Sequence, residues 1–120
     1  MNVYVNLRDE LTVLETEEIA YVEANSNYSD IYFIKGGKRT LAIVLSKIEA
    51  LIKTTYQNSD NCPFVRVGRS LLINQMYLVH IDIIRQKLQL DDYNGHSYCL
   101  TVSKGLLKKY KKTFPLFDLD

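Results

Sequence analysis

Three polar segments separate apolar stretches of this 120-residue chain, and their side chains have the chemistry to contact nucleic acid. NSNYSD at 25–30 is rich in amides and hydroxyls, which can hydrogen-bond to base edges or phosphates. VRVGRS at 65–70 places two arginines around a glycine, and SKGLLKKYKK at 103–112 is the densest basic cluster. A plain polar turn also explains the first segment and a solvated helix face the third, so both interpretations stay open.

The two arginines of the second segment, Arg66 and Arg69, need hydrogen-bond acceptors because most residues around them are apolar. A guanidinium group can hold guanine O6 and N7, or a phosphate, through two parallel hydrogen bonds. It can equally pair with a carboxylate such as that of Glu23. For Arg66 the residues alone favour neither alternative.

The sequence contains no recognisable catalytic or metal-binding motif. His80 and His96 fall in or beside predicted strands, without a zinc-peptidase, serine-hydrolase or nucleotide-binding pattern. The acids at 91–92 precede Asn94 and Gly95, where carboxylates are typical of turns. We therefore expect a protein that is not an enzyme and that uses no metal, cofactor or small-molecule substrate.

Cysteine usage indicates a reducing compartment. Cys62 and Cys99 lack the spacing of a metal or redox site, and two cysteines do not make a disulfide scaffold. Because Cys99 alternates with hydrophobic neighbours, we predict that it is a small buried apolar residue. We also find no signal peptide and no apolar run long enough to cross a bilayer. These observations predict a cytoplasmic protein that does not contact a membrane.

The elements that must position the polar segments are mostly short β-strands. β-branched and aromatic runs between turn signals predict strands at 2–6, 11–14, 19–24, 31–34, 38–44, 64–67, 71–74, 77–84, 87–90 and 97–102. The pairs Gly36–Gly37 and Asn94–Gly95 are typical of hairpin turns. We therefore expect antiparallel pairing between neighbours in the chain.

Two helices complete the predicted elements. Leucines and isoleucines at helical spacing predict one amphipathic helix over about 44–54, and the turn-rich stretch 54–63 is expected to form a loop. Ser103 can cap a short C-terminal helix. The order of elements excludes βαβ units and the paired helices of a helix-turn-helix. We expect one mostly β domain over 1–120, with an N-terminal hairpin at 1–14 and a tail at 113–120.

Charge is distributed unevenly although the net charge is only +1. Residues 1–30 hold one basic and seven acidic side chains, a net charge of −6, which leaves +7 for the remainder. Such a division can make one face attractive to phosphate. The low total nevertheless predicts weak non-specific binding to nucleic acid, so base contacts and duplex deformation would carry more of the affinity.

Four blocks of the chain resemble, in order and spacing, the LytTR DNA-binding domain over about residues 17–112. They are IAYVEANSNYSDIYF, KRTLAIVLSKIEALI, FVRVGRSLLINQMYLVHID and YCLTVSKGLLKKY. The most specific piece comprises Phe64, Arg66, the Gly68–Ser70 run and Asn74. The family frequently has histidine where this chain has Gly68. The resemblance implies a fold of stacked small antiparallel sheets with a short helix.

The resemblance also implies a function: a bacterial transcription factor whose loops enter successive major grooves and bend the duplex. It carries DNA-contact roles onto Asn25, Asn27, Tyr28, Ser29, Arg69, Ser103 and Lys104. Phosphate contacts are expected of Lys38, Arg39, Lys108 and Lys109. Arg66 is then expected to be a structural ion-pair partner and not a base contact. The register of the Ser103–Lys104 junction is defined to within one residue.

The partners implied are double-stranded DNA with repeated half-sites, and a second copy of the chain or a sensor or receiver protein. We expect no receiver domain within these residues, because the segment before residue 15 is too short to fold alone. An alternative is a LytTR-like domain used for protein contact, which the near-neutral charge and nine tyrosines would suit.

Overall fold

The computed structural model describes residues 1–57 and 61–117, which contain ten β-strands and two α-helices. The strands are β1 (Asn2–Asn6), β2 (Leu11–Glu15), β3 (Ile19–Asn25), β4 (Tyr28–Phe33), β5 (Lys38–Leu41), β6 (Phe64–Arg66), β7 (Leu71–Asn74), β8 (Leu78–Asp82), β9 (Lys87–Asp91) and β10 (Ser97–Thr101). The helices are α1 (Leu45–Thr55) and α2 (Lys104–Lys111), and single 3₁₀ turns lie at Thr16–Glu18 and Gln75–Tyr77. The expectation of a mostly β fold is confirmed.

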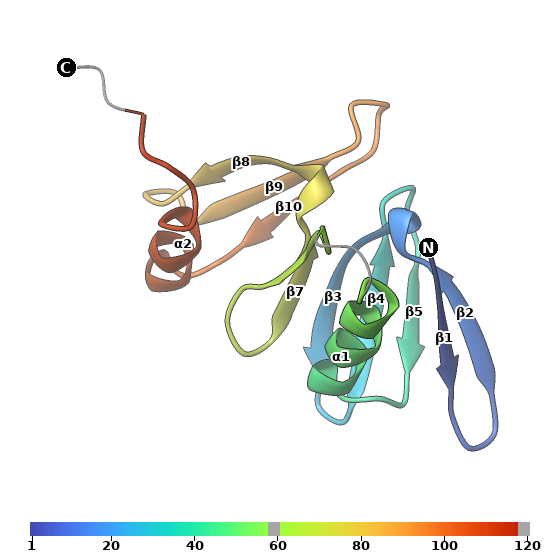
Figure 1. Ribbon diagram of the computed structural model, residues 1–120. Helices are drawn as coiled ribbons and strands as arrows, with labels where there is room; N and C mark the ends of the chain where they lie inside the picture. Colours follow the sequence, from blue (N-terminus) through green and yellow to red (C-terminus); the bar gives the residue numbers. More distant parts are fainter. Residues whose placement is uncertain (58–60, 118–120) are drawn as a thin grey trace.

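The strands form three antiparallel sheets. The largest has the order β5-β4-β3-β7-β6, the next has the order β10-β9-β8, and β1 pairs with β2 alone. Figure 1 shows the five-stranded sheet in the middle, with α1 and the β1–β2 hairpin on one side and the β8–β10 sheet with α2 on the other. The molecule is accordingly elongated, with extents of 57 × 30 × 29 Å.

The five-stranded sheet separates two hydrophobic cores because successive side chains of a strand face opposite sides. On β3, Val22 belongs to the core beneath α1 and the N-terminal hairpin, whereas Tyr21 belongs to the core beneath β8–β10 and α2. Ile48 and Ile52 of α1 are fully buried in the first core, and Leu107 of α2 in the second. The helical spacing of these residues is what fixes the inner face of each helix.

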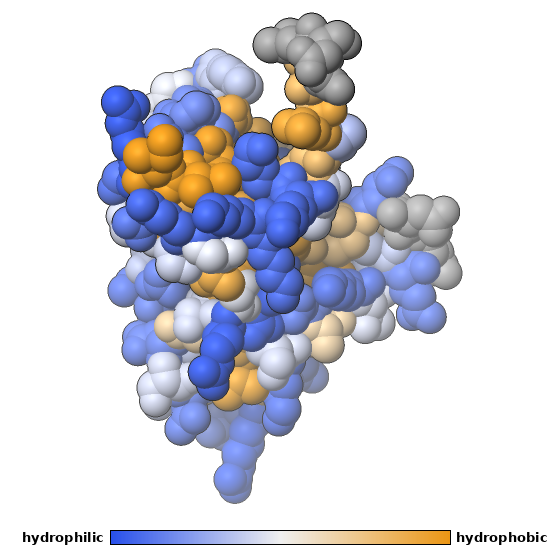
Figure 2. Space-filling view, turned by 90° about the vertical axis from the view of Figure 1, so that its left-hand side faces the viewer, coloured by the Kyte–Doolittle hydropathy of each residue, from blue (hydrophilic) through white to orange (hydrophobic). Residues whose placement is uncertain are grey.

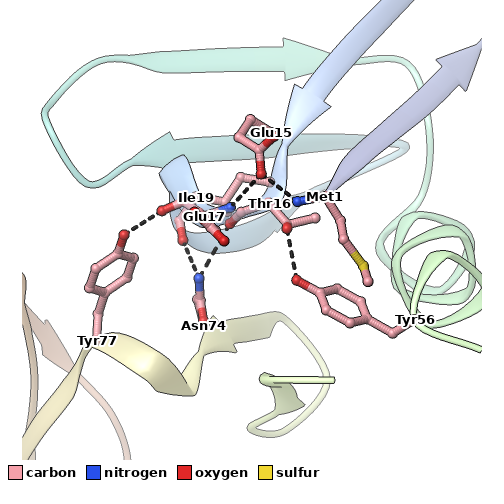
Figure 3. A network of polar contacts seen from close by, with 8 residues as sticks. All are labelled: Met1, Glu15, Thr16, Glu17, Ile19, Tyr56, Asn74 and Tyr77. Carbon is pink, nitrogen blue, oxygen red and sulfur yellow. Dashed lines mark hydrogen bonds and ion pairs between the residues drawn. The ribbon is translucent and has the colours of Figure 1, made fainter. Parts of the chain in front are cut away.

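A buried asparagine connects the layers at the start of β3 (Figure 3). The Asn74 side-chain amide donates to the carbonyls of Thr16 and Ile19, and its carbonyl oxygen accepts from the Met76 backbone N–H. The Thr16 hydroxyl also bonds to the Tyr56 hydroxyl at the end of α1, 2.8 Å away. Asn74 therefore fixes where the chain leaves the large sheet and enters the β8–β10 sheet.

Several sequence-based expectations about turns are confirmed. The N-terminal hairpin pairs as predicted, and Gly36 and Gly37 both have positive φ between β4 and β5. Ser103 caps α2 by accepting a hydrogen bond from the Leu106 N–H. Of the predicted loop at 54–63, residues 58–60 lie outside the described residues, as do 118–120 of the tail. No helix in the described part is long and apolar enough to span a membrane.

Two expectations were wrong in detail. The polar segment 25–30 is not a loop, because β3 continues through Asn25 and β4 begins at Tyr28. Cys99 is exposed and not buried, since it alternates with inward-facing Tyr98 and Leu100 and therefore faces outward. The hairpin predicted at Asn94–Gly95 is confirmed, and its five-residue loop between β9 and β10 has positive φ at Tyr93 and Gly95.

Candidate nucleic-acid interface

The first candidate segment is the tight turn between β3 and β4. Asn25 pairs with Tyr28 across the hairpin, and Ser26 has a φ of +56°. Asn25, Asn27 and Tyr28 are all exposed, and 49% of the Tyr28 surface is accessible. The two antiparallel strands thus present amide and phenol groups at their end, where they are free to approach a partner.

Ser29 does not share this exposure, although the sequence placed it with the other contacts. Its side chain is completely buried, and its hydroxyl donates to the Ile43 carbonyl at 2.6 Å. The neighbouring Asp30 faces the opposite side of β4 and is also buried. Ser29 therefore contributes an internal hydrogen bond between β4 and the chain after β5, and its side chain is not at the surface.

Asp30 organises the face of the sheet next to this turn. One carboxylate oxygen accepts from the Thr40 hydroxyl at 2.5 Å, and the other accepts from the Asn25 amide at 3.2 Å. The Lys38 ammonium lies 3.9 Å from that second oxygen and 5.9 Å from the centre of the Tyr32 ring. Asn25 is thus oriented by a buried acid, because a hydrogen bond to a carboxylate fixes the amide better than solvent does.

The two candidate phosphate contacts on β5 face opposite sides of the sheet. Lys38 pairs with Tyr32 and Leu41 with Ser29, so the N-terminal end of β5 is beside the glycine turn. Arg39 is exposed on the face opposite to Lys38, and it forms no ion pair within the described residues. The structure therefore places the Lys38 ammonium near the Asn25 amide, because both contact the same Asp30 oxygen, whereas Arg39 lies on the other face of the sheet.

The second candidate segment, the Arg69 loop (residues 67–70), connects β6 to β7. Gly68 has a φ of +85°, and the ideal position of a Cβ there lies 2.7 Å from the Leu106 side chain of α2. The loop is tied to β3 because the Ala24 N–H donates to the Ser70 carbonyl at 2.8 Å. The Arg69 guanidinium is exposed and has no hydrogen bond or ion pair with any residue the structure describes. It is therefore free to bind an external acceptor.

Arg66 has the structural role that the resemblance implied, but its partner is not Glu23. Its Nη1 donates to the Glu49 carboxylate of α1 at 2.8 Å. Its Nε and Nη2 donate to the carbonyls of Gly68 and Arg69 at 3.0 and 2.8 Å. The sequence could not identify this carboxylate, because the approach of α1 to β6 depends on packing in the first core.

The third candidate segment is the junction of β10 and α2. Ser103 is exposed and has an extended backbone with φ −60° and ψ 151°, and α2 begins at Lys104. The Ser103 hydroxyl accepts weakly from the Leu106 N–H at 3.4 Å. A hydroxyl that caps a helix retains a donor, so Ser103 can still bond to an external acceptor.

The second and third segments meet at one surface hollow of about 360 Å³. Its lining comprises Glu23, Val67, Arg69, Ser70, Leu71, Thr101, Val102, Ser103 and Leu106. Arg69 and Ser103 therefore lie together despite their separation in sequence, whereas Lys104 does not line the hollow.

The hollow is also lined by Glu23, which the sequence suggested only as a partner of Arg66. Glu23 is exposed on β3, two residues before Asn25 and on the same face of the sheet. The two-residue spacing of Glu23 and Asn25 on a predicted strand could have indicated in the sequence that they share a face. A carboxylate can accept a hydrogen bond from cytosine N4, and it repels phosphate. Glu23 therefore suits contact with a base edge better than contact with the DNA backbone.

The lysines of α2 are distributed over more than one surface. All of them are exposed, because Leu107 and Tyr110 form the buried side of the helix. Lys109 lines a second hollow of about 490 Å³ together with Arg66 and Arg69. Lys108 instead lines a hollow with Ile83 and the chain after α2. Figure 2 shows this side of the molecule, where hydrophilic side chains surround an apolar patch.

Comparisons with known proteins agree with this architecture. A solved structure from Bacillus cereus, the LytTr DNA-binding domain of a protein named as a methyl-accepting/DNA response regulator, superposes with a TM-score of 0.59. The two chains are 19% identical, and the match covers 92% of this chain and 94% of that chain, which shows a shared fold. No curated protein matches the chain. A family model described as the LytTr DNA-binding domain matches residues 9–114. The chain therefore belongs to the LytTR family of DNA-binding domains.

Proposed function

We propose that this protein binds double-stranded DNA with sequence specificity and regulates transcription in the bacterial cytoplasm. The observation that carries the proposal is the exposed guanidinium of Arg69, which has no ion pair with any described residue and shares one hollow with Ser103 inside a domain of the LytTR family. Arginine reads guanine through O6 and N7, and a pair of such bonds distinguishes one base pair from the others. A binding role, and not catalysis, is what this surface is suited to.

The proposed footprint has three parts. The turn of Asn25, Asn27 and Tyr28 supplies amide and phenol groups, the Arg69 loop supplies a guanidinium, and the Ser103–Lys104 junction supplies a hydroxyl and an ammonium. We propose that these parts enter the major groove from loops, because neither helix belongs to a helix-turn-helix pair. Lys38, Arg39, Lys108 and Lys109 are the proposed phosphate contacts around them.

Selection from randomised duplexes tests the proposal. The full chain, at a stated salt concentration, should enrich one motif, and tandem half-sites in that motif would support binding by two copies. Affinity for the enriched duplex should exceed affinity for a scrambled duplex by about 10³-fold or more. Selection that enriches no motif would contradict sequence-specific binding and favour the alternative, a LytTR-like domain used for protein contact.

A further inference from the structure

Arg66 holds the Arg69 loop through its side chain, and we call the guanidinium with its partners, the Gly68 and Arg69 carbonyls and the Glu49 carboxylate, the polar clamp. A guanidinium group presents five N–H donors in one rigid plane. Here Nε and Nη2 donate to two successive carbonyls of the loop, those of Gly68 and Arg69. No other donor bonds to either carbonyl within the described part of the chain. The backbone from which the Arg69 side chain extends therefore depends on Arg66.

The clamp is oriented by helix α1. The Glu49 carboxylate accepts from Arg66 Nη1 at 2.8 Å through Oε1, and its Oε2 lies 3.1 Å from the Lys53 ammonium. The Glu49 side chain is only 16% exposed and that of Arg66 29%, so solvent screens this pair less than a fully exposed pair. Because α1 is fixed in the first core by Ile48 and Ile52, Glu49 provides a rigid reference for the guanidinium.

Backbone hydrogen bonds hold the two ends of the loop, at Val67 and Ser70, but not the carbonyls of Gly68 and Arg69. The positive φ of Gly68 is favourable mainly for glycine, which also has the largest conformational freedom to lose. Across the base of the loop, Val67 N–H bonds to the Leu71 carbonyl at 2.9 Å, and this leaves Gly68 and Arg69 outside the strand ladder. The Arg66 side chain therefore holds the middle of the loop, between the backbone bonds at its two ends.

We propose that Arg66 and Glu49 are positioning residues for DNA recognition, which set the sequence specificity of Arg69 without touching DNA. This inference rests on the proposed function. It assigns to α1, which carries none of the proposed DNA contacts, a direct influence on which base pair is selected. A loop whose carbonyls are released samples more backbone conformations, so Arg69 would bind several acceptors in place of one.

A double-mutant cycle separates this role from a stabilising one. Arg66→Lys keeps the charge but cannot bridge two carbonyls and a carboxylate at once. We expect it to lower the ratio of affinities for selected and scrambled duplexes by about tenfold. In an Arg69→Ala background the same substitution should change that ratio little, because the residue it positions is gone. Lys53→Ala is the matched control, since it removes the other partner of Glu49 and should leave the ratio unchanged.

The outcomes are distinguishable, with thermal unfolding used to confirm that each variant is folded at the assay temperature. If the wild-type chain enriches no duplex, the proposed function fails and this inference fails with it. If the wild-type chain is specific but Arg66→Lys lowers the ratio equally with and without Arg69, or not at all, only the positioning role is overturned. If Arg66→Lys does not fold, Glu49→Gln, which keeps the side-chain shape, is measured in the same cycle and judged by the same criterion.

Discussion

At the scale of single residues, two exposed arginines lie in different surroundings: Arg69 lines the hollow with Ser103, and Arg39 lies on β5. Arg69→Ala should remove roughly 1–3 kcal/mol of discrimination at one base pair, because a guanidinium that contacts a base edge is lost. Arg39→Ala, on the exposed face of β5, should weaken binding to all duplexes alike and reduce the salt slope by about 0.9. Titrations of the selected duplex and its single-base variants at several salt concentrations measure both effects. The same loss of discrimination in both variants would contradict the distinction.

Ser29 makes a different prediction, because its hydroxyl is used inside the protein. Ser29→Ala leaves the buried Ile43 carbonyl without its donor, which should lower the free energy of unfolding by about 1–3 kcal/mol. Discrimination between duplexes should stay as in the wild type, since the side chain is not at the surface. Urea unfolding measures the first quantity and duplex titration the second. Loss of discrimination without loss of stability would restore Ser29 as a DNA contact.

At the scale of elements, the sequence predicted both helices and the succession of strands along the chain, because helical spacing indicates α1 and the Ser103 cap indicates α2. It did not predict that β3 and β4 continue into the polar segment. Antiparallel pairing of Asn25 with Tyr28 stabilises strand structure there, and polar composition alone favours a loop. The Glu49 partner of Arg66 was also not predictable, because it arises from contact between elements far apart in sequence.

The packing of α2 through Tyr110 predicts that the free energy of unfolding decreases at alkaline pH. Burial raises the pKa of Tyr110 from 10.0 to about 12, and its hydroxyl donates to the Gln75 side chain. Since the folded-state pKa lies above the unfolded value, the stabilisation is complete below about pH 10 and is lost as pH rises through about 12. Its size is of order 2–3 kcal/mol.

Urea unfolding at about pH 9 and at about pH 11.5 measures this loss, and Tyr110→Phe is the matched variant because it cannot ionise. It should show a smaller decrease in stability between the two pH values than the wild type. Some decrease should remain, since burial also raises the pKa values of Tyr21 and Tyr98. An unchanged decrease would show that α2 is not the element that responds.

At the scale of the whole molecule, the candidate contacts come from separate layers. The Asn25–Tyr28 turn and the Arg69 loop belong to the five-stranded sheet, whereas Ser103 follows the β8–β10 sheet. Their arrangement depends on the second core, in which Val67, Val102 and Leu107 pack together. The sequence predicted each segment but not the shared hollow, because no local pattern encodes the distance between two sheets. The proposed sequence specificity therefore depends on how the layers pack.

The net charge of +1 makes one last contrast measurable. A protein with a low net charge makes few phosphate contacts, so its affinity for DNA depends only weakly on salt concentration. The loss of one phosphate contact should then be a measurable fraction of that dependence. Lys109 lines a hollow with Arg69, whereas Lys108 lies beside Ile83 and the chain after α2. Lys109→Gln should thus reduce the slope of log affinity against log salt by about 0.9, and Lys108→Gln by less, although both change the net charge equally. Equal reductions would mean that α2 lies along the DNA backbone with both lysines and that position relative to Arg69 is irrelevant.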